Sequence, residues 1–229
     1  MINLNPHLVA ILFAISLIGC SGNKKPVIDI EATGNSKNDM LSMMEQANVP
    51  GVSIAVIKDF EIIETIAAGV IDQSSQEVVT EQTRFQAASI SKMVTALAVM
   101  KWATETQTPM ETDVSEMLTS WQLPENGLVT EDPVTIEGIL RHTAGINVHG
   151  FAGYNQSELI PTLLQVLEGS GDANSDPIQV TSAPNSEWRY SGGGFTVLQQ
   201  AIEDFTDMSF SEFMDWQLID FFGLNYTTF

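Results

Sequence analysis

The stretch that most constrains this chain is an apolar helical segment that begins with a hydroxyl and an amine three residues apart. Residues 89–102 are mostly good helix formers, and their composition predicts a helix. The apolar positions that recur at helical spacing are Met93, Ala96, Leu97 and Met100. Residues i and i+3 share a helix face, so the Lys92 amine can stand beside the Ser89 hydroxyl. If burial favours the neutral amine, it can take or give the hydroxyl proton, and the positive end of the helix dipole favours an anion there.

A Ser-x-x-Lys pattern alone is weak evidence, because the segment Ser21-Gly22-Asn23-Lys24 matches it as well. For an isolated match, the alternative is a helix cap followed by a solvated lysine. The context of the two matches differs. The match at Ser21 lies in a polar run, whereas the match at Ser89 follows a predicted pair of strands and opens a long apolar helix.

Composition limits the class of protein. The chain has 229 residues, of which 44% are hydrophobic, which is enough for one globular domain of moderate size with a substantial core. The formal net charge is -20, from 29 acidic and 9 basic residues. Such a charge repels nucleic acid and anionic membrane surfaces, so nucleic-acid binding is excluded.

The first residues predict export. Residues 8–18 form an apolar run that is too short to favour a membrane span, and it ends in Leu17-Ile18-Gly19-Cys20. This segment resembles the lipobox of bacterial lipoproteins, so residues 1–19 are predicted to be a signal peptide and Cys20 the lipidated residue. The alternative is an ordinary secretory leader with a chance cysteine. Either reading predicts the bacterial cell envelope, with the protein lipid-anchored or periplasmic.

A flexible tether and one domain are predicted to follow. Residues 20–37 are polar and lack an apolar period, so the domain is expected to cover residues 38–229. A helix over 38–47 should precede a hairpin of strands 52–57 and 61–68, with Phe60 where the turn would favour glycine. The later expectations are a short helix capped by Thr135 and stopped by Gly145, a helix over 159–167, a polar loop over 169–184 and a helical run over 197–202.

Three further side chains are candidates for chemistry. Tyr190 precedes a run of glycines, where it could place its phenol against a catalytic hydroxyl; the alternative is an aromatic packing residue before a turn. His142 could act as a general base, but a packed, hydrogen-bonded structural role is the better hypothesis for it and for His149. No metal or other cofactor is predicted, because neither metal-ligand spacing nor a phosphate-binding loop is present.

Together these stretches resemble the serine β-lactamase and penicillin-binding-protein superfamily, in particular its class C-like serine hydrolases, esterases and D-alanyl peptidases. The segments that carry the resemblance are residues 50–56, 83–92, 140–145, 190–192 and 222–229. The resemblance implies an α+β fold of the β-lactamase/transpeptidase type, with an antiparallel sheet flanked by helices and a helical region. It also implies a small acyl substrate: a β-lactam, a peptidoglycan peptide or an ester.

The resemblance also implies roles for residues of this chain. Ser89 matches the acylated nucleophile, Lys92 its proton partner and Tyr190 the general base of a Tyr-x-Asn motif. Gly192 stands where the family commonly has the asparagine that binds the substrate amide, so Ser191 and Gly192 are the candidate substrate-binding residues. Asp207 is a second departure, at a position where glycine is usual.

A third motif of the family, Lys-Thr-Gly or His-x-Gly on a later strand, has no match after Tyr190. The expectation is therefore the N-terminal part of the domain, without the C-terminal strands. Two hypotheses remain open. The chain is an acyl-serine hydrolase, or it is a catalytically inactive envelope lipoprotein with a binding or scaffold role. Its oligomeric state is not predicted.

If Cys20 carries the lipid anchor, the variant Cys20→Ala should leave the membrane fraction and appear in the soluble fraction. The physical reason is that the acyl chains attached at Cys20 supply the apolar area that holds the mature protein on the bilayer. Fractionation after a salt wash, followed by immunoblotting, measures the partition. A Cys20→Ala protein that still sediments with membranes contradicts the lipobox hypothesis.

Overall fold

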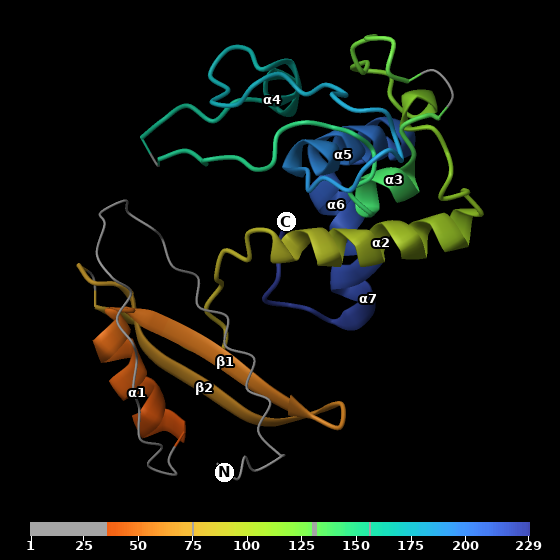
Figure 1. The fold of residues 1–229 in the computed structure, drawn as a ribbon. Helices are drawn as coiled ribbons and strands as arrows, with labels where there is room; N and C mark the ends of the chain where they lie inside the picture. The colour runs from red at the N-terminus through yellow and green to blue at the C-terminus, as the bar shows by residue number, and fades with distance from the viewer. Residues whose placement is uncertain (1–35, 75, 130–131, 156) are drawn as a thin grey trace, which may run out of the picture. The chain divides into compact units, whose positions relative to one another are not determined.

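A computed structural model describes residues 36–74, 76–129, 132–155 and 157–229. These residues belong to two compact units, one up to Phe85 and one from Gln86 to Phe229, and each is described by itself (Figure 1). The predicted signal peptide, Cys20 and nearly all of the predicted tether lie outside the described residues.

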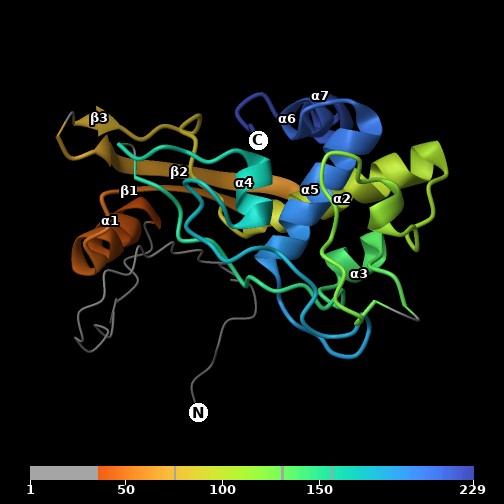
Figure 2. The same cartoon turned by 90° about the horizontal axis from the view of Figure 1, so that it is seen from above.

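The first unit is a hairpin with one helix beside it. Its elements are α1 (Ser36–Ala47), β1 (Gly51–Lys58), β2 (Glu61–Asp72) and β3 (Glu77–Val78). The strands pair antiparallel in the order β1-β2-β3, as Figure 2 shows. Met44 of α1 is buried, and its carbonyl accepts a hydrogen bond from the Val49 N–H, which ends the helix before β1. The predicted helix and both predicted strands are present, and each is longer than expected.

The hairpin turn explains the unusual Phe60. Lys58 pairs with Glu61, so the loop has two residues, and both lie in the left-handed region: Asp59 at φ 51° and Phe60 at φ 65°. Two positive φ angles define the type I′ turn, whose twist matches that of the strands. Phe60 occupies a position that favours glycine, and its ring is fully exposed.

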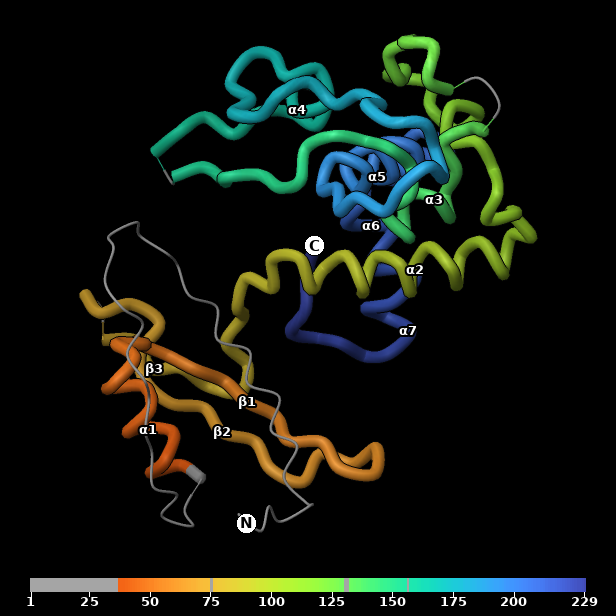
Figure 3. The backbone as a smooth tube through the Cα atoms, viewed as in Figure 1, coloured from red at the N-terminus to blue at the C-terminus, as the bar shows by residue number. Residues whose placement is uncertain are grey.

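The second unit is mainly helical. Its elements are α2 (Ile90–Thr106), the 3₁₀ helix η1 (Val114–Glu116), α3 (Ile136–Leu140), α4 (Leu163–Glu168), α5 (Gly192–Thr206), α6 (Phe210–Met214), the π-helical turn η2 (Asp215–Ile219) and α7 (Asp220–Phe222). Long connections join α3, α4 and α5, as the tube in Figure 3 shows. One hydrophobic core unites the unit, with fully buried side chains from α2, α3, α5 and α6.

Helix α2 buries a different face from the one that its apolar spacing marks. Met93, Leu97 and Met100 are 63%, 54% and 53% exposed. The buried positions are Thr95, Ala98, Val99, Trp102 and Ala103. The reason is tertiary: the Trp102 ring packs edge-on against the rings of Phe205 and Phe213, at centroid distances of 5.6 and 6.1 Å.

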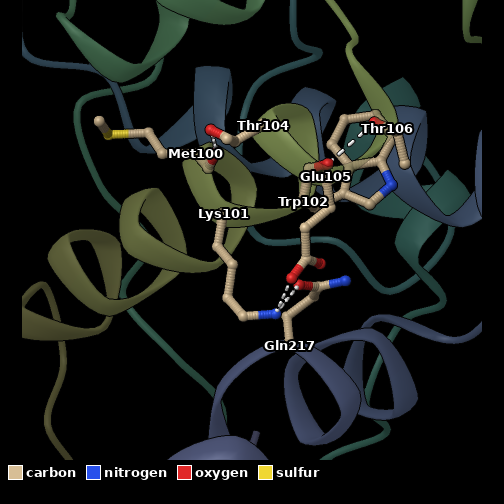
Figure 4. A network of polar contacts seen from close by, with 7 residues as sticks. All are labelled: Met100, Lys101, Trp102, Thr104, Glu105, Thr106 and Gln217. Atoms are coloured by element: carbon tan, nitrogen blue, oxygen red, sulfur yellow. Dashed lines mark hydrogen bonds and ion pairs between the residues drawn. The ribbon is translucent and has the colours of Figure 1, made fainter.

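A polar contact holds the C-terminal half of α2 against η2 (Figure 4). The Lys101 Nζ donates hydrogen bonds to Glu105 Oε1 at 2.7 Å and to Oε1 of the fully buried Gln217 at 3.0 Å. It also lies 4.8 Å from the centre of the Phe221 ring. The lysine therefore links the exposed edge of α2 to the buried π-helical turn.

Two predicted helices are shorter than expected. Thr135 caps α3 as predicted, with its hydroxyl accepting from the Gly138 N–H, but α3 ends at Leu140 because His142 adopts a left-handed conformation well before Gly145. Helix α4 begins at Leu163, where Thr162 and Gln165 form a reciprocal capping box.

The predicted polar loop over 169–184 contributes to the core. Ile178 and Val180 are buried, and Val180 bridges to Ile146. Among the described residues, no helix has the length and hydropathy needed to cross a membrane.

The left-handed Phe60 predicts a stabilising substitution. Phe60→Gly should raise the free energy of unfolding by about 1 kcal/mol, because glycine adopts positive φ without the steric cost of a Cβ atom. Phe60→Ala is the matched control, since it removes the exposed ring but keeps the Cβ atom. Urea unfolding of the three proteins measures the effect. An equal gain in Phe60→Ala would show that the exposed ring, and not the backbone, causes the instability.

Candidate active site

Ser89 and Lys92 come together at the start of α2. Ser89 directly precedes the helix, is exposed, and does not use its side chain to cap the helix. The Lys92 Nζ donates a long hydrogen bond of 3.5 Å to Ser89 Oγ. The residue before them, Ala88, has φ 46°, a left-handed conformation that is uncommon for a residue with a side chain. The helix turn thus presents an uncommitted hydroxyl beside an amine.

Tyr190 lies next to Lys92. The Lys92 Nζ is 5.3 Å from the centre of the Tyr190 ring and 5.6 Å from that of Phe195. Tyr190 Oη is buried and makes no hydrogen bond to the described residues. Burial acts to raise the pKa of Tyr190, but the neighbouring Ser89 hydroxyl and Lys92 ammonium outweigh it and hold this pKa below its ordinary value of 10.0. A phenol with a lowered pKa is a better proton acceptor near neutral pH.

Two histidines flank the Tyr190 ring. The ring centres of His142 and His149 lie 4.4 and 4.8 Å from that of Tyr190. His142 Nδ1 accepts a hydrogen bond from the Ser191 N–H at 3.2 Å, and the His142 carbonyl accepts from the Arg189 N–H at 2.8 Å. The ring is therefore packed and hydrogen-bonded, as the structural hypothesis for His142 predicts.

The electrostatics keep His142 neutral. Partial burial lowers the pKa of His142, and the positive charge of Lys92 and the neighbouring His149 lower it further. Because Nδ1 accepts a hydrogen bond, the ring proton belongs on Nε2. A neutral imidazole beside Tyr190 adds no charge that would compete with Lys92.

Ser191 and Gly192 help to form the start of α5. The Ser191 hydroxyl is buried; it donates to the Asn147 carbonyl at 2.8 Å and accepts from the Gly194 N–H at 2.8 Å, which caps α5. Its role in substrate binding stays a prediction, and this hydroxyl is already occupied. A Cβ atom on Gly192 would come within 3.1 Å of the His149 carbonyl oxygen.

The glycines at positions 192–194 allow α5 to pack closely and do not form a turn. Helix α5 begins at Gly192, whereas the sequence predicted a turn there, and the first three helical residues are fully buried glycines. A Cβ atom on Gly193 would approach the Asn147 carbonyl oxygen to 2.8 Å. The helix can therefore lie directly on the backbone of the segment 147–150 only because these residues lack side chains.

The sequence did not predict Phe195 at the site; it raised His142 as a possible general base but favoured structural roles for His142 and His149. Phe195 follows the glycines by one residue, and its ring packs 5.5 Å from that of His142. The available signal was the clustering of aromatic residues around the Tyr190 motif: Trp188, Tyr190 and Phe195 lie within one short segment. Two further aromatic rings so close to the candidate phenol are more than a turn requires.

The comparisons with known proteins agree with one another. A family model described as Beta-lactamase matches residues 38–229. Penicillin-binding protein 4 of Amycolatopsis lactamdurans is 24% identical over 184 residues, which are 80% of this chain and 46% of that protein. Protein flp of Staphylococcus aureus is 22% identical over 189 residues, 81% of this chain and 36% of that protein. The chain thus spans less than half the length of these relatives.

Solved structures show the same fold. The octameric penicillin-binding protein homologue from Pyrococcus abyssi superposes with a TM-score of 0.65 at 24% identity, covering 82% of this chain and 42% of that one. The hydrolase EstCE1, described as having promiscuous acyltransferase activity, gives a TM-score of 0.64 at 22% identity and covers 80% and 49%. At these identities the likeness establishes the α+β fold alone.

The lowered pKa of His142 predicts an acid-sensitive step in stability. In the unfolded chain His142 binds a proton with the ordinary pKa of 6.5, whereas in the folded chain its pKa is lower. The contribution of this site to stability is therefore lost as pH falls from 6.5 through the lowered pKa. His142→Gln should flatten the pH dependence of the free energy of unfolding below 6.5. Urea unfolding of both proteins above and below that pH measures the slope.

Only the difference in slope tests this prediction, because the substitution can also change stability at all pH values through the Ser191 hydrogen bond. Equal slopes for the two proteins would contradict it.

Proposed function

Because this chain belongs to the beta-lactamase family, we propose that it is an acyl-serine hydrolase with Ser89 as its nucleophile. The observation that carries the proposal is the convergence of three groups: the free Ser89 hydroxyl, the Lys92 ammonium that bonds to it at 3.5 Å, and the Tyr190 phenol with a lowered pKa. An activated nucleophile requires a hydroxyl within reach of a base whose own position is fixed, and these three groups support that arrangement.

In the proposed mechanism, Tyr190 in its phenolate form accepts the Ser89 proton while Ser89 Oγ attacks the substrate carbonyl carbon. The C–O bond of the acyl-enzyme forms, the bond to the leaving group breaks, and the proton returns from Tyr190 to that group. Water then attacks the acyl-enzyme, giving its proton to Tyr190, and Ser89 is released with this proton. Lys92 stabilises the phenolate throughout as a fixed positive charge.

The start of α2 supplies part of the stabilisation of the negative carbonyl oxygen. The first N–H groups of a helix carry its positive dipole end, and those of Ile90, Ser91 and Lys92 donate to the carbonyls of Ala87, Ala88 and Ser89. None of the hydrogen bonds between described residues uses the Ser89 N–H, so this donor is available beside the attacked carbon. One such donor contributes roughly 3 to 4 kcal/mol to the transition state in acyl transfer.

The substrates proposed are β-lactams, peptidoglycan peptides and small esters. Gly192 bears on the choice, because the amide of an asparagine side chain is missing at the start of α5 and the Ser191 hydroxyl is committed to the Asn147 carbonyl and the Gly194 N–H. A site that makes only weak hydrogen bonds to a substrate amide should prefer esters, because the alcohol of an ester leaves without such help. We therefore place esters first.

The direct test is covalent labelling. An activated ester or a fluorophosphonate should add one acyl or phosphonyl group to Ser89, seen by intact mass spectrometry and located by peptide fragmentation, with Ser91 and Ser191 unmodified. Ser89→Ala should abolish the labelling. Tyr190→Phe should slow it by roughly 100- to 10,000-fold, the usual contribution of a general base.

The chain offers its own matched control, because Ser21 also stands three residues before a lysine. Ser21→Ala should label at the rate of the unmodified protein. A label on a residue other than Ser89 would overturn the assignment. A folded protein that takes no label at all would instead favour the inactive, binding lipoprotein.

A further inference from the structure

A groove of about 570 Å³ lies beside the candidate active site, along one face of α5. Gly192, Phe195, Gln199 and Glu203 line it, at helical spacings of three and four residues that put them in one row. Lys92 also lines the groove, at the end where its Nζ lies 5.6 Å from the Phe195 ring. Glu203 comes about three turns after Gly192, roughly 16 Å farther along the helix axis.

Aromatic side chains form much of the wall. Phe151, Phe195, Phe210 and Phe229 all line the groove, and the rings of Phe210 and Phe229 meet edge to face at 6.1 Å. Such rings offer apolar area for a hydrocarbon chain, and their faces attract cations.

Glu203 gives the far end of the groove a negative charge without a cation beside it. Its Oε1 accepts hydrogen bonds from Gln199 Nε2 at 3.2 Å and from the Phe210 N–H at 3.1 Å, and both donors are neutral. The ion pairs found among the described residues are Lys101 with Glu105 and Arg141 with Glu137, so neither includes Glu203. The side chain is only half-buried, so its carboxylate can still reach a ligand.

We infer that this groove selects acyl substrates that carry an ammonium group at the end of an apolar chain. The inference rests on the proposed acylation of Ser89. The carbonyl would lie at Ser89, the chain along the phenylalanines, and the ammonium against Glu203 and the neighbouring rings. A net charge of -20 favours the approach of such a cationic substrate over that of an anionic one. A substrate carboxylate at the same place would meet Glu203 and be repelled.

The kinetic test compares two p-nitrophenyl esters of equal medium chain length, one ending in an ammonium group and one ending in a methyl group. The acylation rate constant of the full chain should be about tenfold larger for the ammonium ester, the combined effect of one partly exposed ion pair and a cation–π contact. The ratio should fall as salt is added, because screening weakens the ion pair.

Glu203→Gln should bring the ratio of the two rates close to one. The substitution removes the charge and keeps an oxygen that can accept from the Phe210 N–H. Asp207→Asn is the matched control: it removes the same charge from the end of the same helix, outside the groove, at a left-handed position that asparagine tolerates. It should keep the ratio of the unmodified protein. A ratio near one in the unmodified protein, or a preference that survives Glu203→Gln, overturns the inference.

A binding measurement separates this inference from the proposed function. A medium-chain alkyltrimethylammonium salt should bind to the full chain in calorimetry, and Glu203→Gln should weaken the binding several-fold while Asp207→Asn does not. This binding can be measured whether or not Ser89 is acylated. Absent labelling of Ser89 with specific ammonium binding would refute the hydrolase and keep the groove as a cation-binding site. Labelling of Ser89 without ammonium binding would support the hydrolase and refute the cation-binding groove.

Discussion

The site depends on one close approach between two backbones. The N–H groups of Gly192 and Gly193 donate hydrogen bonds of 3.0 Å each to the carbonyls of His149 and Val148, which ties the start of α5 to the segment 147–150. This contact satisfies helix donors that would otherwise lack partners. It also favours glycine, most strongly at Gly193, where a Cβ atom would come within 2.8 Å of the Asn147 carbonyl oxygen. Tyr190 is placed by this contact, since it precedes the fixed helix start by two residues.

Once Tyr190 is fixed, its electrostatic setting follows from its neighbours. Lys92 stands over the face of the ring, and His142 and His149 cover it from other directions. Partial burial, the charge of Lys92 and the neighbouring His149 lower the pKa of His142, whose Nδ1 accepts a hydrogen bond from the Ser191 N–H. The result is a phenol with one fixed cation beside it and neutral imidazole near it. Ser191 therefore links two features: its hydroxyl caps α5, and its N–H holds the His142 ring that packs beside Tyr190.

Local signals in the sequence predicted the local structure. The β-branched runs located the hairpin, Thr135 located a helix cap, and the spacing of Ser89 and Lys92 placed both on one helix turn. The buried face of α2 could not be predicted in this way, because Met100 and Trp102 are both apolar and only the partners Phe205 and Phe213 decide which side is covered. The groove depends on segments far apart in the sequence, so spacing within any one of them does not reveal it.

Four of the ten described non-glycine residues with positive φ illustrate two different consequences of this conformation. Phe60 and Asp207 lie in a hairpin turn and at the end of α5, where the conformation only ends one element or joins two. Ala88 and His142 lie next to the proposed nucleophile, Ser89, and beside the proposed general base, Tyr190, with φ of 46° and 60°. A left-handed residue with a Cβ atom costs roughly 1 to 2 kcal/mol, so it persists where the surroundings fix it. At Ala88 this cost accompanies an exposed Ser89 hydroxyl that does not cap the helix, and at His142 it accompanies the ring contact with Tyr190. At these two positions the unfavourable backbone therefore accompanies side-chain directions that matter for the proposed chemistry.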